Sequence, residues 1–139
     1  MLEDESILIV DDDIVLLEMY EQRFKAEGAM VMVAHDGAEA ITMAEENKPS
    51  LILLDLLLPR LNGFEVLETL KQGADTKEIP VVVLTVLLED DKYTRAKNLG
   101  ANAFLVKSEV MPIDVVEKVK SILAEKEKAD ALQIESPNQ

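Results

Sequence analysis

The chain has 139 residues, a length that suits a single folded domain with a sizeable core. It contains no cysteine, which excludes disulfides, thiolate metal sites and a cysteine nucleophile. Its formal net charge of −14 disfavours direct binding to nucleic-acid phosphates. The acidic start, Met1-Leu2-Glu3-Asp4-Glu5, and apolar runs too short to cross a bilayer lead us to expect a cytoplasmic chain without membrane contact.

Short apolar runs alternate along the chain with segments of helical periodicity. The runs cover residues 7–10, 31–33, 51–54, 80–84 and 103–106. Between and after them, apolar residues recur three or four positions apart, which predicts five helices. In chain order these helices contain Leu17, Tyr20 and Phe24; Ala40, Ile41 and Ala44; Val66, Leu67 and Leu70; the thin apolar face of 89–99; and Val115, Val116, Val119, Ile122 and Leu123.

The alternation predicts an α/β fold. Continuously apolar strands are typical of a parallel sheet that is buried on both faces, and right-handed crossovers then give an open, doubly wound sheet flanked by five helices. Periodicity does not give the order of the strands. We take residues 1–126 as one domain. Because the pattern fades near Glu127, we expect residues 127–139 to form the end of the last helix and a frayed tail.

Polar side chains follow four of the five apolar runs. They are Asp11, Asp12 and Asp13 after the first run, Asp55 after the third, Thr85 after the fourth and Lys107 after the fifth. Because ligands bind outside the carboxyl ends of parallel strands, we expect these groups to meet at one edge of the sheet. Any one of them alone is usually a helix cap or a solvated charge, and capping is the expected role of Asp13.

Carboxylates gathered in this way repel each other unless a cation lies between them. Oxygen ligands favour Mg²⁺, with Mn²⁺ as a second possibility, and Mg²⁺ usually keeps waters and substrate phosphate oxygens among its ligands. An aspartate beside such a metal can accept a phosphoryl group. Thr85 and Lys107 could then bind the phosphoryl oxygens through a hydroxyl and an ammonium.

The motifs resemble the receiver domains of bacterial response regulators, the CheY-like family. They are Ile7-Leu8-Ile9-Val10-Asp11-Asp12-Asp13, Leu53 to Gly63 around Asp55-Leu56-Leu57-Leu58-Pro59, Leu84-Thr85 and Leu105-Val106-Lys107. The resemblance extends from about Ser6 to Leu123. It implies strand order 2-1-3-4-5 and the function of a phosphoacceptor in a two-component system, signalling through protein contacts and not turning over a substrate.

The resemblance also implies roles for individual residues. Asp55 would be phosphorylated by a histidine kinase or phosphotransfer protein, and Mg²⁺ would be held by Asp11, Asp12, Asp55 and the backbone carbonyl of Leu57. Thr85 and Lys107 would bind the phosphoryl group, and Phe104 matches an aromatic switch position. A downstream protein, or a second copy of the chain, would dock on the face built by the fourth helix, fifth strand and fifth helix.

The sequence departs from the family pattern at three positions near the predicted site. Ser108 follows Lys107 where the family usually has a proline after a cis bond, and a cis bond before a non-proline residue costs roughly 2.5–4 kcal/mol. We therefore predict a trans bond between Lys107 and Ser108. Val86 is bulkier than the usual alanine or glycine and could narrow access to Asp55. Phe104 lacks the hydroxyl of the more common tyrosine, which leaves only rotation of an apolar ring.

Four other functions compete with this interpretation. A haloacid-dehalogenase-type phosphatase needs a second aspartate two residues after the first, where this chain has Leu57. A dinucleotide-binding domain needs a glycine-rich turn where Asp11-Asp12-Asp13 stands. An adaptor that works without phosphorylation, and a receiver separated from a longer DNA-binding regulator, both stay open.

The positions two residues after Asp55 and two after Thr85 hold Leu57 and Leu87. In the family these positions guide or block the water that hydrolyses the acyl phosphate, and a leucine cannot orient water. Together with Val86, they are the residues expected to tune the reaction. We predict slow self-dephosphorylation, measured as the loss of phosphate after loading from a small phosphodonor; decay within seconds would contradict it.

Overall fold

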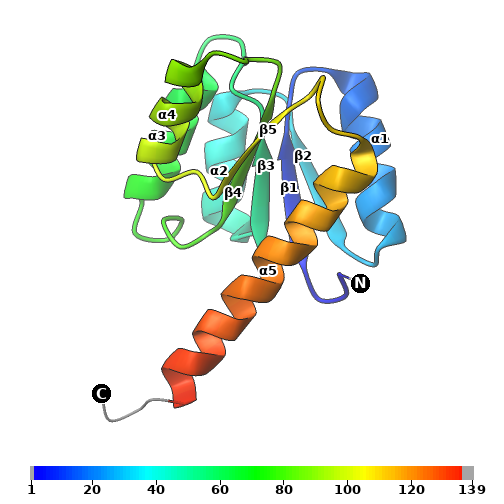
Figure 1. Cartoon of the computed structure of the whole chain (residues 1–139), viewed down its shortest axis with the longest axis vertical. Coiled ribbons are helices and arrows are strands. Elements are labelled where there is room, and N and C mark those ends of the chain that lie inside the picture. Colours follow the sequence, from blue (N-terminus) through cyan, green and yellow to red (C-terminus); the bar gives the residue numbers. More distant parts are fainter. Residues whose placement is uncertain (1, 136–139) are drawn as a thin grey trace.

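The computed structural model describes residues 2–135 and has five strands and five helices in strict alternation (Figure 1). The strands are β1 (Ser6–Val10), β2 (Met30–Ala34), β3 (Leu51–Leu54), β4 (Val81–Thr85) and β5 (Ala103–Val106). The helices are α1 (Ile14–Ala26), α2 (Gly37–Asn47), α3 (Gly63–Gln72), α4 (Asp90–Asn98) and α5 (Pro112–Glu135). All paired strands are parallel, in the order β2-β1-β3-β4-β5, which confirms the predicted fold.

Alternating side chains divide the core into one layer on each face of the sheet. In β1, Leu8 and Val10 point into the layer beneath α2, α3 and α4, whereas Ile7 and Ile9 point into the layer beneath α1 and α5. The central strand β3 is buried along its whole length. This double burial explains why the strands are continuously apolar in the sequence.

Polar residues at the ends of the strand-to-helix loops cap three of the helices. Asp13 caps α1 by accepting a bond from the Leu16 N–H, as predicted, and Asp36 caps α2 through the Glu39 N–H. Asn62 and Glu65 form a reciprocal capping box at the start of α3. These caps satisfy backbone N–H groups that a helix start leaves free, and they fix where each strand-to-helix loop ends.

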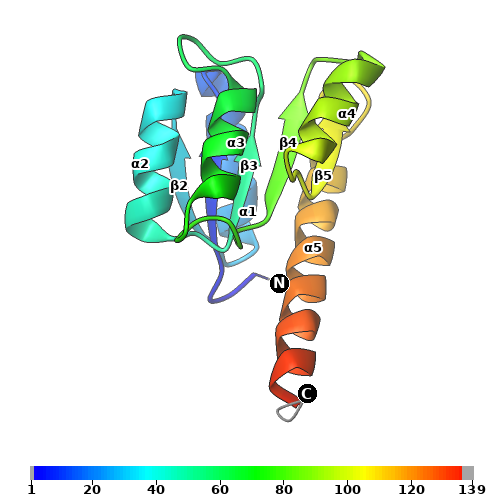
Figure 2. The same ribbon diagram turned by 90° about the vertical axis from the view of Figure 1, so that its left-hand side faces the viewer.

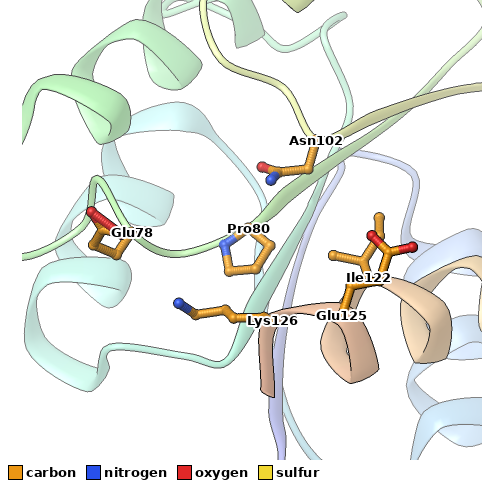
Figure 3. A pocket seen from close by; sticks show the side chains of 6 residues that line it. All are labelled: Glu78, Pro80, Asn102, Ile122, Glu125 and Lys126. Carbon is orange, nitrogen blue, oxygen red and sulfur yellow. The ribbon is translucent and has the colours of Figure 1, made fainter. Parts of the chain in front are cut away.

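The last helix is longer than the apolar pattern indicated. The pattern fades near Glu127, but α5 continues to Glu135, and Figures 1 and 2 show its second half extending past the amino-terminal edge of the sheet. Residues 136–139, the end of the predicted tail, lie outside the described residues. A hollow of about 330 Å³ separates Glu78, Pro80 and Asn102 from the α5 residues Ile122, Glu125 and Lys126 (Figure 3).

Lys71 and Asn102 hold this amino-terminal edge together. The Lys71 ammonium donates to the Ile79 carbonyl at 2.8 Å and to the Asn102 side-chain oxygen at 3.3 Å. The same Asn102 oxygen accepts from the Val81 N–H at 2.9 Å, at the start of β4. Burial lowers the pKa of Lys71.

Within residues 2–135, no helix combines the length and apolar character that a bilayer span requires.

Candidate functional site

The carboxyl ends of four strands bring the predicted site residues to one edge of the sheet. Asp11 follows β1, Asp55 follows β3, Thr85 is the last residue of β4 and Lys107 follows β5. The parallel ladder continues into these positions, since the Asp55 N–H donates to the Val10 carbonyl at 3.0 Å and the Lys107 N–H to the Thr85 carbonyl at 2.7 Å. The sheet therefore fixes the backbone of each group before any side-chain contact is made.

One ammonium group joins the two buried carboxylates. Lys107 Nζ lies 2.8 Å from Asp11 Oδ2 and 3.1 Å from Asp55 Oδ2. Asp11 is 2% exposed and Asp55 is 5% exposed, so both carboxylates depend on partners within the protein. Backbone groups satisfy their other oxygens: the Asp13 N–H donates to Asp11 Oδ1 and the Leu57 N–H to Asp55 Oδ1.

Burial and charge act in opposite directions on these groups. Burial raises the pKa of the Asp11 carboxyl, although the Lys107 ammonium and the Asp13 N–H both work to lower it. Burial likewise works to lower the pKa of Lys107, but hydrogen bonds and charge from Asp11 and Asp55 outweigh it and raise that pKa. The lysine is therefore held in its charged form between the two carboxylates.

The acidic cluster fits a hard divalent cation. Asp11, Asp12 and Asp55 can each place one carboxylate oxygen so that the three atoms lie within 4.8 Å of one another. Asp12 is exposed, whereas the other two are buried, so the cluster opens to solvent on one side. An all-oxygen donor set with an open side suits Mg²⁺, which keeps part of its water shell.

Thr85 lies at the end of β4 beside the cluster, and Phe104 lies on the neighbouring strand β5, opposite Val83. Thr85 is fully buried, and its Oγ1 has no hydrogen-bond partner among the described residues. An unpaired buried hydroxyl costs free energy unless a ligand satisfies it. Phe104 in β5 is half-buried, and its ring meets that of Tyr93 in α4 edge to face, with ring centres 5.5 Å apart.

The three apolar residues expected to tune the site lie around its rim. Leu57 is 49% exposed and Val86 is 52% exposed. Leu87 is half-buried and packs against the core layer beneath α2, α3 and α4.

Every peptide bond in the described chain is trans, so the prediction of a trans bond between Lys107 and Ser108 is confirmed.

Gly63 holds the acceptor loop in place, a contact that the sequence analysis missed. A Cβ atom at Gly63 would lie 2.3 Å from Leu56 Cα and 2.5 Å from the Asp55 carbonyl oxygen. The Gly63 N–H also donates to the Leu56 carbonyl at 3.0 Å. The sequence does not predict this contact, because the close approach of Gly63 to another segment leaves no local pattern.

Comparison with known proteins decides the family. The profile of the response regulator receiver domain matches residues 7–120 of the chain. The chain belongs to the response regulator receiver family. Its members are signalling phosphoacceptors, so this receiver domain is a component of two-component signal transduction, as the resemblance implied.

Individual relatives agree with this assignment. Protein PilH of Pseudomonas aeruginosa is 31% identical over 118 residues, which cover 85% of this chain and 94% of that protein. The solved CheY-like receiver domain of Methanospirillum hungatei JF-1 superimposes with a TM-score of 0.84 at 32% identity, covering 90% of this chain and 98% of that one. The alkaline phosphatase synthesis regulator PhoP of Bacillus subtilis is 35% identical over 124 residues.

Several relatives are considerably longer than this receiver domain. The matched segment spans 50% of PhoP and 52% of a probable transcriptional regulator, ycf27, from Porphyridium aerugineum. The chain thus covers about half the length of these relatives, whereas it covers nearly all of PilH.

Replacing Gly63 by alanine should disturb the acceptor loop directly. The added Cβ must displace the backbone of Asp55 and Leu56, so we expect about tenfold slower labelling by acetyl phosphate and a loss of roughly 1–3 kcal/mol in the free energy of unfolding. Gly100→Ala is the matched control: its positive φ of 106° makes alanine costly far from the site. It should lower stability while leaving the labelling rate within about twofold; equal slowing in both variants would refute the positioning role.

Proposed function

We propose that Asp55 of this receiver domain accepts a phosphoryl group from a histidine kinase or a phosphotransfer protein. The observation that carries the proposal is the pair of short contacts from Lys107 Nζ to Asp11 and Asp55, which joins three strand ends into one charged centre. Asp55 stands at the end of the central strand, with one oxygen bonded to the backbone and the other to a group that can move.

The transfer forms a bond between an Asp55 Oδ atom and phosphorus while the bond from phosphorus to the donor histidine nitrogen breaks. The histidine leaves with the electron pair and takes up a proton. Lys107 and the unpaired Thr85 hydroxyl would bind oxygens of the transferred group, exchanging carboxylate contacts for phosphoryl contacts. Asp11, Asp12, Asp55 and the backbone carbonyl of Leu57 would hold Mg²⁺, which neutralises charge on the phosphoryl oxygens when bound.

We further propose that phosphorylation is read out on the face formed by α4, β5 and α5. A Thr85 side chain drawn toward a phosphoryl group leaves space beside β5, and Phe104 is the half-buried ring on that strand. Its edge-to-face contact with Tyr93 links it to α4, a helix whose single buried residue is Ala96. A loosely packed helix responds readily to such a change, so this face suits a downstream protein or a second copy.

The rim of the site supports an apolar contact with the phosphodonor. Large apolar side chains are exposed around the cluster at the starts of α1 and α5 and in the β3–α3, β4–α4 and β5–α5 loops: Ile14, Val15, Leu57, Val86, Leu88, Met111 and Ile113. Such residues around a charged centre suit a partner that presents its histidine from an apolar helical surface.

Slow loss of the phosphoryl group from Asp55, expected from Leu57 and Leu87, stays a prediction.

The chain would act as a cytoplasmic signalling module and not as a turnover enzyme. The chain's net charge of −14 supports protein partners over nucleic acid. An adaptor that works without phosphorylation is less favoured, because the buried carboxylates, the lysine and the unpaired threonine would then serve no chemical purpose.

Labelling by acetyl phosphate tests the acceptor. We expect Mg²⁺-dependent incorporation into the wild type and none into Asp55→Asn, because an amide cannot form the acyl phosphate. Asp13→Asn is the matched control, since Asp13 is a helix cap at the same edge and asparagine caps equally well. Equal labelling of wild type and Asp55→Asn would remove Asp55 from the reaction.

Transfer from a protein donor tests the apolar rim separately. Val15 is 78% exposed, so Val15→Asn should leave folding and acetyl phosphate labelling unchanged. It should slow transfer from a phosphotransfer protein that is active on the wild type by about fivefold or more, since truncated apolar anchors cost more than 1 kcal/mol. Leu132→Asn, at an exposed position on α5 far from the site, serves as the control. Unchanged transfer to Val15→Asn would exclude this docking surface.

A further inference from the structure

The outer edge of β2 is an open strand edge. β2 is the first strand in the sheet order, and β1 is its partner within the described residues. The Met30 N–H donates to the Glu5 carbonyl at 2.9 Å, and the Ala34 carbonyl accepts from the Asp11 N–H at 3.2 Å. The even-numbered residues of β2 therefore bond toward β1, and alternation turns the N–H and C=O groups of Val31 and Val33 toward the open side.

This edge lacks the features that usually protect an open strand. The segment 30–34 contains no charge, proline or glycine, whereas natural sheet edges commonly carry at least one of these. Met30 is 73% exposed, and the next three residues are half-buried. Half-buried methionines pack on both sides of the strand, Met19 from α1 and Met43 from α2. Methionine side chains adapt readily to a partner surface.

We propose that two copies of this chain pair along β2, antiparallel and about a twofold axis at Met32. In this register Val31 of one copy lies opposite Val33 of the other, so their free N–H groups donate to each other's free carbonyls. Registers centred one residue away would need the N–H of Ala29 or His35 instead. Those groups already donate to the Phe24 carbonyl at 3.1 Å and to Glu39 Oε1 at 2.7 Å.

The exposed Met30 side chain finds a place in this arrangement. Even-numbered residues of β2 point to the α2 side of the sheet, where Met32 and Ala34 pack. The register sets Met30 of the second copy opposite Ala34, at the end of β2. An open hollow of about 590 Å³ lies beside that end, lined by His35, Asp36, Ala38, Glu39, Thr42 and Met43. The apolar side chains of Ala38 and Met43 offer contact to the incoming methionine.

Charge favours the antiparallel orientation, although the whole chain carries −14. The α1 and β2 segments together contain two acidic and two basic residues and are neutral. The last turn of α1, before β2, carries Arg23 and Lys25, whereas Asp36 and Glu39 follow β2 at the start of α2. Antiparallel pairing brings the start of one strand beside the end of the other. The basic last turn of α1 then lies at the same end of the interface as the acidic start of α2 of the second copy, on the opposite face of the sheet.

Single cysteines report the register directly, because the chain has none of its own. Met32→Cys places two thiols opposite each other across the axis, where antiparallel strands bring the Cα atoms to about 4.5 Å. Met30→Cys is more exposed, but its copies would lie roughly 13 Å apart. Under mild oxidation of the unphosphorylated protein, we expect disulfide dimers of Met32→Cys to form at least about fivefold faster.

Two other results would overturn the proposal. If Met30→Cys formed disulfide dimers faster than Met32→Cys, random collision would explain the crosslinks. If Tyr93→Cys formed them faster than Met32→Cys, the chains would associate through the α4–β5–α5 face. Sedimentation equilibrium of the intact chain gives a second test that leaves the monomer core untouched. Met30→Glu would set a carboxylate beside Asp36 and Glu39 and should weaken the dimer about tenfold, whereas Met30→Leu should stay within about twofold. A wild type that is monomeric at several hundred micromolar, on the order of 10⁻⁴ M, would also exclude it.

Discussion

Two buried carboxylates share one ammonium group, and the rest of the site follows from how that arrangement is maintained. Two negative charges buried beside each other repel strongly unless a positive charge lies between them. Lys107 Nζ supplies it at 2.8 and 3.1 Å, and backbone N–H groups bond the remaining oxygens. The contact with Asp55 is also one that a phosphoryl group can replace, because the oxygens of that group offer the lysine an equivalent acceptor.

The sheet makes this arrangement possible by purely local means. Parallel strands end at one edge, so a single polar residue after each strand is enough to assemble a charged centre from segments 96 residues apart, as for Asp11 and Lys107. Side-chain caps then fix the starts of α1, α2 and α3, and Gly63 lets α3 approach the carbonyl of Asp55 closely. Stability resides in the two apolar layers, which leaves the edge free for chemistry.

The sequence was most informative where burial dictates a pattern. Strands buried on both faces appear in the sequence as apolar runs. The polar residues that follow these runs predicted which side chains meet at the edge of the sheet. Strand order was not readable from periodicity, because register between strands leaves no mark along the chain, and it came only with the family resemblance. The chain after Glu127 loses its apolar pattern yet stays helical to Glu135, since alanine, glutamate and lysine favour a helix without packing. Contacts such as Gly63 with Asp55, or Tyr93 with Phe104, depend on tertiary approach and could not be read locally.

The central claim is that the phosphoryl group is carried by Asp55 and by no other carboxylate of the cluster. Borohydride reduces an aspartyl phosphate to homoserine, and peptide mass spectrometry then gives the position of the changed residue. After loading with acetyl phosphate and Mg²⁺, the account predicts homoserine at position 55, with Asp11 and Asp12 unchanged. Homoserine at position 11 or 12, or none in protein that has taken up phosphate, would contradict it.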